Sequence, residues 1–280
     1  MENYLIRELD WKQDDVTHVY DELPLWSSPF GLLLLDNFPI GEYENYLDIG
    51  FGTGFPLIEI SQRLGINCQS YGIDQWKAAF KRASTKIETI KTENVILIEG
   101  DASKISLPDN YIDLITSNLG INNFENPLNV LSECKRVLKS SGSFCLTTNL
   151  TGTFSEFYQI FFDTLNELKF DKYSSKLNDH INHRGTEEST IELIEKSGFS
   201  ITKTIKSNYS MRFLNGSAFL NHSFTIVGFI DSWRNMFDQA DKSNFFDRFE
   251  KNLNNYSKQK GELKLTIPML YIECKKNSNA

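Results

Sequence analysis

The chain has 280 residues, enough for one large domain or for one domain that carries a substantial cap. Its hydrophobic fraction of 40% and its 21 phenylalanines supply a sizeable core. A formal net charge of −8 disfavours non-specific binding to nucleic acid, since such binding draws on dense positive charge. The apolar run at Leu32–Leu35 is far too short to span a bilayer.

The cysteine pattern and the N-terminus bear on the compartment. The four cysteines, Cys68, Cys134, Cys145 and Cys274, are widely spaced and form no Cys-x-x-Cys pair. This spacing favours buried, reduced thiols over a metal site or disulfides. The N-terminus is acidic and lacks the apolar segment of a signal peptide. We therefore expect a soluble, cytoplasmic protein with no metal and no membrane span.

Strand and helix patterns alternate in the first half of the chain. Residues 10–40 are aromatic and acidic, contain Trp26-Ser-Ser-Pro29, and predict helices that cover one edge or the mouth of a sheet. Apolar runs of strand character follow at 46–49, 69–73, 94–98, 111–116 and 143–147. Helical segments are predicted near 55–64, 75–90 and 126–138. This alternation predicts parallel strands with right-handed crossovers.

The pattern loosens after Asn149. Helices are predicted at 154–170, at 187–196 with Gly198 as its C-terminal stop, at 216–237 and at 241–256. Strands are predicted at 199–206 and 262–274. Pro268 suggests a bulge or an edge position in the last strand. The arrangement indicates two final strands interrupted by a helical insertion near 208–260.

A glycine-rich turn separates the first predicted strand from the first predicted helix. The strand covers 46–49, helical spacing resumes at 57–64, and the turn contains Gly50, Gly52 and Gly54. Missing side chains let a ligand approach the backbone closely. Asp48 lies two residues before the first glycine, and Asp74 ends the next apolar run. This layout is typical of a nucleoside-bearing cofactor site in a doubly wound α/β fold.

The position of the third glycine distinguishes a dinucleotide-binding motif from another cofactor-binding motif. A dinucleotide fingerprint, G-x-G-x-x-G, would place that glycine at position 55, which is Phe55. Gly54 comes one place early, and Asp48 precedes the turn, so the motif resembles the D/E-x-G-x-G-x-G sequence of class I S-adenosylmethionine-dependent methyltransferases. The resemblance implies that Asp48 favours the amino group of the cofactor, directly or through water. The backbone from Gly50 through Phe51 and Gly52 would border the methionine part.

Two further motifs match the same family. The resemblance implies that Asp74 accepts both ribose hydroxyls, while Gln75 and Trp76 border adenine. Asp101, followed by Ala102, would accept the exocyclic amine of adenine. Each residue also has a structural alternative. Asp74 and Asp101 are suited to capping the following helix or turn, and Trp76 to plain packing.

A fourth motif lies in the next strand. Residues 111–120 resemble the fourth strand of the family, in which Asn118 and Leu119 would border the cofactor and Asp113 would be structural. Residues 136–142 then resemble the helix and turn that enter the fifth strand.

The resemblance covers about residues 45–149 and implies the fold. We expect a Rossmann-like, doubly wound, mostly parallel seven-stranded sheet with an antiparallel strand near the C-terminus and a helical cap. The expected domains are an N-terminal helical cover (1–44), a cofactor-binding core (45–150) and a C-terminal part (151–280). Within the last, the insertion near 208–260 would cap the acceptor.

Candidate catalytic residues lie outside the core motifs. The polar groups suited to orient or deprotonate an acceptor are His183, Arg184, Tyr209, Arg212 and His222. Residues of each of these types are more often surface or satisfied polar residues than catalysts. The aromatic segment 219–237 is either a core helix or a lid whose Phe219, Phe224 and Trp233 form an apolar acceptor pocket.

The sequence therefore predicts an S-adenosylmethionine-dependent methyltransferase that acts on a partly apolar small molecule. The core most resembles the quinone-biosynthesis and small-molecule branch. A shorter resemblance to malonyl-carrier-protein O-methyltransferases involves Ser117–Gly120, Thr147–Gly152 and Glu156. The alternatives are an O-methyltransferase of a free or carrier-bound carboxylate and a catalytically silent cofactor-binding subunit. Phe55 and Asp48 disfavour a nicotinamide dehydrogenase.

Overall fold

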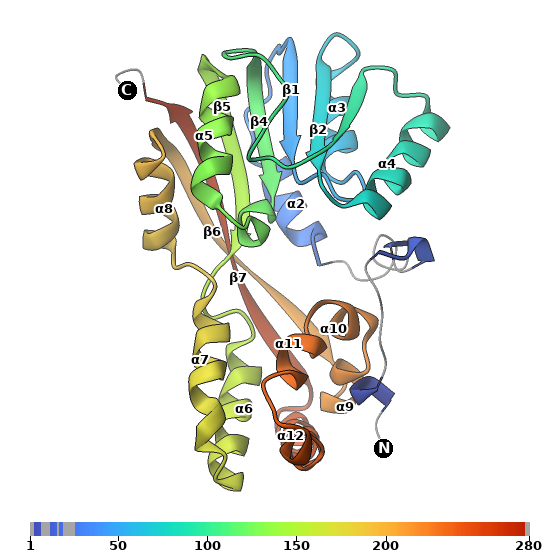
Figure 1. Cartoon of the computed structure of the whole chain (residues 1–280), viewed down its shortest axis with the longest axis vertical. Coiled ribbons are helices and arrows are strands. Elements are labelled where there is room, and N and C mark those ends of the chain that lie inside the picture. The colour runs from blue at the N-terminus through green and yellow to red at the C-terminus, as the bar shows by residue number, and fades with distance from the viewer. Residues whose placement is uncertain (1–2, 7–11, 16, 19–25, 278–280) are drawn as a thin grey trace. The chain divides into compact units, whose positions relative to one another are not determined.

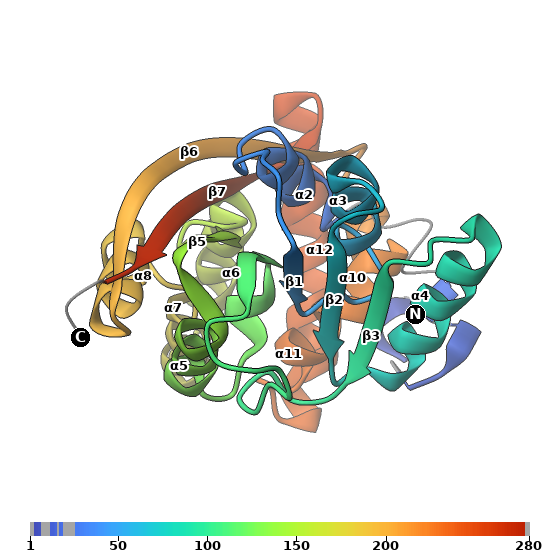
Figure 2. The same cartoon turned by 90° about the horizontal axis from the view of Figure 1, so that it is seen from above.

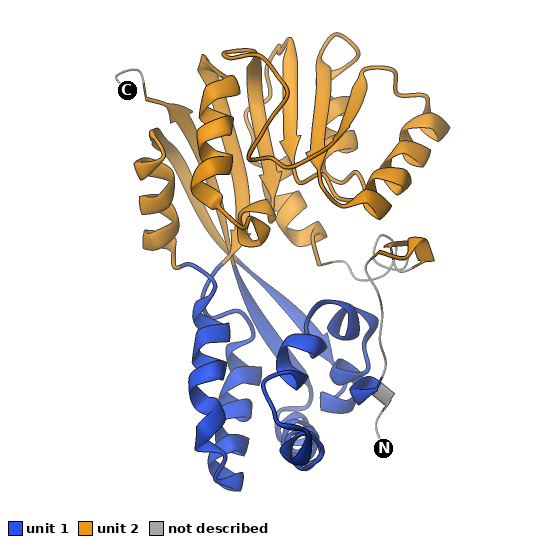
Figure 3. Ribbon diagram, viewed as in Figure 1, with its two compact units in different colours: residues 1–10, 150–185, 208–268 blue, residues 11–149, 186–207, 269–280 orange. Residues whose placement is uncertain are grey.

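The computed structural model of the chain describes residues 3–6, 12–15, 17–18 and 26–277. Contacts divide the chain into two compact units, coloured separately in Figure 3. Unit 1 comprises 1–10, 150–185 and 208–268, and unit 2 comprises 11–149, 186–207 and 269–280. The boundary falls within two long strands, β6 (Phe199–Phe213) and β7 (Leu263–Lys276), so each contributes residues to both units.

A seven-stranded sheet has the order β3-β2-β1-β4-β5-β7-β6. Its other strands are β1 (Asn45–Ile49), β2 (Gln69–Asp74), β3 (Val95–Glu99), β4 (Ile112–Asn118) and β5 (Leu138–Asn149). The first five pair in parallel, whereas β7 is antiparallel to β5, with Ser143 opposite Lys275 and Asn149 opposite Met269. The predicted fold class, with its antiparallel strand near the C-terminus, is confirmed.

β1 lies in the middle of the parallel part and is buried along its whole length. This burial explains its near-continuous apolar sequence, because a central parallel strand is covered on both faces. The helices of this unit are α2 (Ser28–Leu35), α3 (Leu57–Leu64), α4 (Lys77–Ile90), α5 (Pro127–Val137) and α8 (Glu187–Lys196). Figure 2 shows α2 and α3 on one face of the sheet and α5 on the other. The predicted helices at 55–64, 75–90 and 126–138 are thus confirmed.

The helices predicted in residues 10–40 fall only partly on residues that the structure describes. α2 confirms a helix in the segment 10–40, and it packs against β4 and β5. Residues 10–11, 16 and 19–25 of that segment lie outside the described residues.

The last strand differs from the prediction in its position. Pro268 suggested a bulge or an edge, but β7 lies between β5 and β6, and β6 is the edge strand. Pro268 comes just before the residues of β7 that pair with β5, which begin at Met269. Its missing N–H therefore interrupts no bond of the β5–β7 ladder.

Unit 1 is mainly helical. Its helices are α6 (Ser155–Leu168), α7 (Ser174–Asn182), α9 (Gly216–Leu220), α10 (Ser223–Gly228), α11 (Ile230–Arg234) and α12 (Gln239–Lys260), with short 3-10 turns η1 (Asn3–Leu5) and η3 (Asp171–Tyr173). Figure 1 shows their succession along the chain. Among the described helices, none is long and apolar enough to cross a membrane.

The predicted helix over 216–237 is wrong as a single element. Three short helices replace it because the chain caps itself internally. The Asn215 side chain accepts the Ala218 N–H to start α9, and His222 Nδ1 accepts the Phe224 N–H at 3.3 Å to start α10. The backbone conformation of Phe229 then separates α10 from α11.

The aromatic side chains of this segment form the core of unit 1. Trp233 and Phe219 are fully buried, and Phe224 is 3% exposed. The rings of Trp233 and Phe157 of α6 have centroids 4.4 Å apart, and Phe219 contacts Phe157 edge to face. Within unit 1 these side chains therefore pack as the core-helix alternative predicts.

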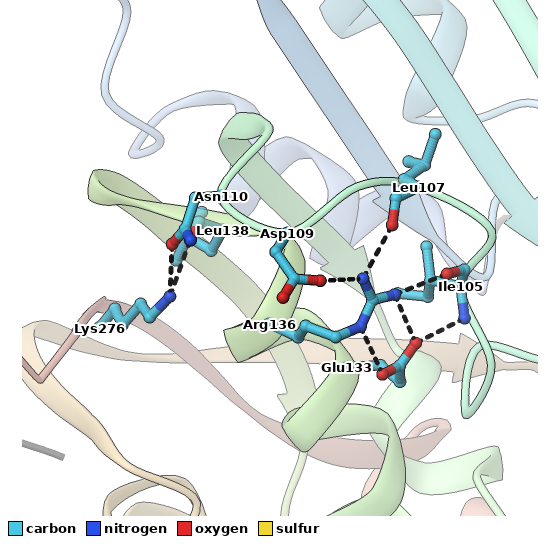
Figure 4. Close-up of polar contacts among 8 residues, drawn as sticks. All are labelled: Ile105, Leu107, Asp109, Asn110, Glu133, Arg136, Leu138 and Lys276. Atoms are coloured by element: carbon cyan, nitrogen blue, oxygen red, sulfur yellow. Dashed lines mark hydrogen bonds and ion pairs between the residues drawn. The ribbon is translucent and has the colours of Figure 1, made fainter.

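An arginine holds the loop that leads into β4. The Arg136 guanidinium donates to both carboxylate oxygens of Glu133 at 2.8 Å, to Asp109, and to the backbone oxygens of Ile105 and Leu107 (Figure 4). Glu133 also accepts the Ile105 N–H at 2.8 Å. α5 therefore fixes this loop through one side chain with most of its donors satisfied.

Candidate functional site

A cavity of about 490 Å³ opens where β1, β2, β3 and β4 end, entirely within unit 2. The carboxyl ends of parallel strands in a doubly wound sheet are where such folds bind ligands. All but two of the predicted cofactor-binding residues line it: Gly50, Phe51, Gly52, Asp74, Gln75, Trp76, Asp101, Ala102, Asn118 and Leu119. The exceptions are Asp48, which is buried at the end of β1, and Gly54, the last glycine of the turn.

The glycine turn is tied to the neighbouring strand. Gly50, Gly52 and Gly54 all have positive φ values, of 77°, 53° and 105°. The Gly50 N–H donates to Ile73 O at 2.8 Å, and the Gly52 N–H donates to Asp74 Oδ2 at 2.7 Å. Residues with side chains rarely adopt these backbone angles, so the turn requires glycine.

Asp74 occupies the end of β2 and uses both carboxylate oxygens. Oδ2 accepts the Gly52 N–H and Oδ1 accepts the Trp76 N–H at 2.8 Å. Burial raises the pKa of this carboxyl, and the N–H donors of Trp76 and Gly52 oppose that rise. A hydrogen bond from the Gln75 N–H also opposes the rise in the pKa of Asp74. Asp74 thus joins the glycine turn to α4 and lines the cavity.

Asp48 is fully buried and does not line the cavity. Its Oδ1 accepts the Thr116 hydroxyl at 2.5 Å, while its Oδ2 has no hydrogen-bond partner among the described residues. Burial is the main cause that raises the pKa of Asp48 to about 7, and the negative charge of Asp74 adds to the rise. A buried carboxylate with an unpartnered oxygen is unusual and indicates a functional constraint.

Asp101 has the turn-capping geometry that the sequence left open. Its two oxygens accept the N–H and the hydroxyl of Ser103 at 2.8 and 2.7 Å. These bonds lower the pKa of Asp101. Because it also lines the cavity, the capped turn holds an ionised carboxylate at the ligand site.

The end of β4 contributes an oriented amide and a strained backbone. Asn118 Nδ2 donates to Ser27 O at 3.1 Å, and Asn118 Oδ1 accepts the Thr147 hydroxyl at 2.7 Å. Leu119 has a φ of 64°, in the left-handed region. A branched residue there costs roughly 1 kcal/mol or more, a strain found most often at functional sites.

The remaining wall of the cavity was not predicted as a site. Trp26, Phe55 and Phe124 supply aromatic surface, and Asn123 through Asn129 supply amide groups and Glu125. Trp26 belongs to a segment predicted to cover the sheet mouth or edge. The segment 123–129 showed no motif, because its position depends on how α5 packs.

Asp113 is structural, as predicted. Its carboxylate accepts the backbone N–H groups of Glu44 and Asn45 at 3.1 and 3.0 Å, and it pairs with Lys139 at 2.9 Å. It therefore anchors the start of β1 beside β4.

The catalytic candidates His183, Arg184, Tyr209, Arg212 and His222 all belong to unit 1, whereas the cavity described above is formed by residues of unit 2. The Arg212 guanidinium donates to Glu262 at 2.6 Å, and His222 caps α10, where burial lowers its pKa. The Arg184 backbone oxygen accepts the Thr151 hydroxyl at 2.6 Å. Arg212 and His222 thus have structural partners within their own unit.

Comparisons with known proteins match the part of the chain that contributes most of the residues lining this cavity. Residues 47–146 match the family model described as a methyltransferase domain. A demethylmenaquinone methyltransferase of Geobacillus sp. (strain WCH70) is 33% identical over 120 residues, which cover 41% of this chain and 51% of the relative. A malonyl-[acyl-carrier protein] O-methyltransferase of Marinomonas sp. (strain MWYL1) is 25% identical over 207 residues, which cover 74% of this chain and 72% of the relative.

Solved structures support the fold. The YcgJ protein from Bacillus subtilis aligns with a TM-score of 0.57 and 18% identity, covering 90% of this chain and 99% of that protein. At that identity the likeness concerns the fold alone. The match to the demethylmenaquinone methyltransferases spans about half the length of those proteins.

Proposed function

We propose that this chain, which through residues 47–146 belongs to the class I S-adenosylmethionine-dependent methyltransferases, transfers a methyl group to a small-molecule acceptor. The observation that supports this most is Asp74. It ends β2 at the cavity and holds the glycine turn through Gly52, with its carboxylate among the lining groups. A carboxylate so placed is suited to two vicinal hydroxyls of a ribose.

The residues present fit the cofactor of the family. Gly52 lines the cavity, and a β-carbon built on it would meet no atom within 4 Å, so its backbone is open to close approach. Asp48 offers an unpartnered buried oxygen at the end of β1, just before the same turn. Asp101 would accept the adenine amine, and Trp76 would pack on the ring. Asn118 and Leu119 would border the cofactor from the end of β4.

S-adenosylmethionine supplies an electrophilic methyl group on a sulfonium. The chain's own contribution is then to hold donor and acceptor in line and to keep water out, which supplies much of the acceleration. The titratable side chains among the described lining residues are Asp74, Asp101 and Glu125. Of these, Glu125 is the one not assigned to the cofactor, so it is the proposed orienting or proton-accepting group for an acceptor.

The acceptor class is supported by aromatic lining residues of the cavity that the cofactor motifs do not include. Trp26, Phe55 and Phe124 give the cavity an aromatic character that suits a partly apolar molecule. The names of the two relatives point to a quinone-type acceptor or to a carrier-bound carboxylate. The alternative of a catalytically silent cofactor-binding subunit has the same binding residues and differs only in turnover.

Calorimetry tests the proposed function directly. We expect micromolar binding of S-adenosylhomocysteine, and no binding of NAD, to the full chain. Asp74→Asn should weaken binding about tenfold or more, because the amide replaces one acceptor with a donor and removes the charge. Asp163→Asn, an exposed acid on α6, is the charge-matched control and should leave binding unchanged.

Turnover separates an enzyme from a silent subunit. The full chain is incubated with S-adenosylmethionine and a bacterial metabolite extract, and methylated products are identified by mass spectrometry. Formation of S-adenosylhomocysteine with one new methylated compound supports the enzyme. Cofactor binding without turnover supports the silent subunit, and binding of NAD in place of S-adenosylhomocysteine contradicts the proposal.

A further inference from the structure

A line of buried hydroxyl groups ends on the Asp48 carboxylate. Tyr46 and Asp48 lie on the same face of β1, and Thr116 of β4 is the register partner of Asp48. The Tyr46 hydroxyl lies 2.7 Å from Thr116 Oγ1, which lies 2.5 Å from Asp48 Oδ1. All three side chains are fully buried. The three groups form one hydrogen-bonded line across two central strands.

When Asp48 is ionised, the donor and the acceptor of each hydrogen bond in this line are fixed. A carboxylate only accepts, so Thr116 gives its single hydroxyl proton to Asp48. Thr116 Oγ1 can then only accept from Tyr46, and the Tyr46 proton points along the line. Each bond polarises the next, and bonds to a charged acceptor are stronger than neutral ones. The arrangement therefore stabilises negative charge on Asp48.

The packing of the core alone does not require these hydroxyls. Valine and phenylalanine would fill the same two positions on buried strands without polar groups, and a core of that kind is often at least as stable. Here two buried hydroxyls support a carboxylate whose second oxygen has no partner among the described residues. An acid held in this way is ready for one further donor or cation.

We propose that Tyr46 and Thr116 are positioning residues that hold the Asp48 carboxylate ionised and oriented for the ammonium group of bound S-adenosylmethionine. This inference rests on the proposed function, because the ammonium group belongs to that ligand. It adds two residues, neither of which lines the cavity, that act on the cofactor through Asp48.

The charges around Asp48 set the expected pH dependence. Burial and the negative charge of Asp74 on β2 raise the pKa of Asp48, and the Thr116 hydroxyl lowers it, with a net value of about 7. Tyr46 on β1 stays neutral, since burial and Asp48 raise its pKa well above the ordinary value. In the free chain Asp48 is thus protonated below about pH 7, and only the ionised form attracts an ammonium group.

Two ligands distinguish binding of the ammonium group from binding of the adenosine part. S-adenosylhomocysteine carries the ammonium group, whereas 5′-methylthioadenosine keeps the adenosine part and lacks the amino-acid end. In the wild-type chain, the affinity for the first should rise about tenfold between about pH 6 and about pH 8, and the affinity for the second should stay constant. The ratio of the two affinities is the measured quantity.

Substitutions of the two hydroxyls should move that profile. Thr116→Val removes the donor to Asp48, so the ratio at about pH 7 should fall several-fold and its midpoint should move to higher pH. Thr116→Ser should restore the wild-type profile. Tyr46→Phe, which keeps the packing, should give a smaller shift in the same direction. Melting temperatures of all variants verify that each is folded.

Three outcomes would overturn the inference. A wild-type ratio that does not change with pH would exclude a titrating Asp48 at the site. An unshifted profile in Thr116→Val would show that the hydroxyl line does not act on Asp48. Equal losses for both ligands would show a merely structural role. If the wild-type chain binds neither ligand, the proposed function itself has failed.

Discussion

The three glycines of the turn after β1 share a positive φ but differ in the space around them. A β-carbon on Gly54 would lie 2.7 Å from Ile58 Cδ1, so this glycine permits α3 to pack on the turn. A β-carbon on Gly52 would meet no atom within 4 Å, although Gly52 lines the cavity. Gly54 therefore lies against α3, whereas the backbone of Gly52 has open space beside it at the cavity.

Gly52→Ala should separate ligand binding from stability. Its backbone angle makes the substitution cost roughly 1–2 kcal/mol of folding free energy. The added methyl projects into the cavity, so S-adenosylhomocysteine affinity should fall about tenfold or more through overpacking. Gly65→Ala is the matched control, because Gly65 also has a positive φ and open space but does not line the cavity. Equal affinities in the two variants would contradict the role assigned to Gly52.

The place of some site residues could be predicted from the local sequence, and the place of others could not. Asp74 follows an apolar run directly, and Asp101 lies two residues beyond the end of β3, so their place near strand ends could be predicted. The resemblance placed Asp48 at the cofactor, but its burial and its bond to Thr116 could not be predicted, because Thr116 belongs to β4, which is far from β1 in the sequence. The segment 123–129 reaches the cavity only through tertiary packing and carries no periodic signal.

At the level of elements, Arg136 links α5 to the loop before β4. It contacts Glu133 one turn earlier on its own helix and three groups of the loop, Ile105 O, Leu107 O and Asp109 (Figure 4). Nearby, Lys276 of β7 donates to Asn110 Oδ1 at 2.7 Å and to Leu138 O at 3.3 Å. The loop is therefore held from two sides by cationic side chains.

Arg136→Lys should destabilise the chain although it keeps the charge. A lysine cannot reproduce the planar set of donors, so the loop carbonyls lose their partners at a cost of about 1–3 kcal/mol. Arg63→Lys on α3 is the control, since its pair with Glu59 is exposed and should be worth about 0–1 kcal/mol. Urea unfolding measures both, and equal changes would contradict the special role of Arg136.

The Arg136 contribution should also depend on pH. The bond from Arg136 lowers the pKa of Glu133 below its ordinary value of 4.5. A carboxyl with a lowered pKa in the folded state stabilises that state above its ordinary pKa, and the stabilisation is lost as the pH falls below it. The difference in unfolding free energy between wild type and Arg136→Lys should therefore shrink below about pH 4.5.

The position of α8 could be predicted because its capping residues and its hydrophobic period indicate the same ends. α8 occupies Glu187–Lys196 as predicted, with a capping box at Thr186 and Gly198 at positive φ beyond its end. The segment 216–237 is apolar on most faces, so its period gave no sign of an interruption. The caps formed by Asn215 and His222 could not be separated from ordinary polar residues in sequence.

At the level of the whole chain, the two units have different kinds of core. Unit 2 is built on the sheet, whereas the core of unit 1 is a cluster of aromatic rings around Phe157 and Phe249. The mostly parallel seven-stranded sheet and its antiparallel strand near the C-terminus could be predicted from the alternating pattern and the family resemblance. The division into units could not, because it separates residues that are adjacent within β6 and β7.

Trp233→Ala tests the aromatic core. Trp233 is fully buried against Phe157, so its truncation should lower the free energy of unfolding by about 3–5 kcal/mol. Leu214→Ala, in the same unit, removes a side chain that is 77% exposed and should change stability by no more than about 0.5 kcal/mol. Comparable losses in thermal unfolding for the two variants would contradict this packing.

The position of β7 in the sheet also limits the order in which the strands can pair during synthesis. β7 is synthesised after β5 and β6, yet it lies between them in the sheet. Until it arrives, β5 has an open edge and β6 has no neighbour in the sheet. Open edges of this kind attract other chains, and nascent domains fold from the N-terminus as they emerge. Residues 45–149 can thus assemble first, but a truncation within β7 would leave a long, unpaired strand edge prone to aggregation.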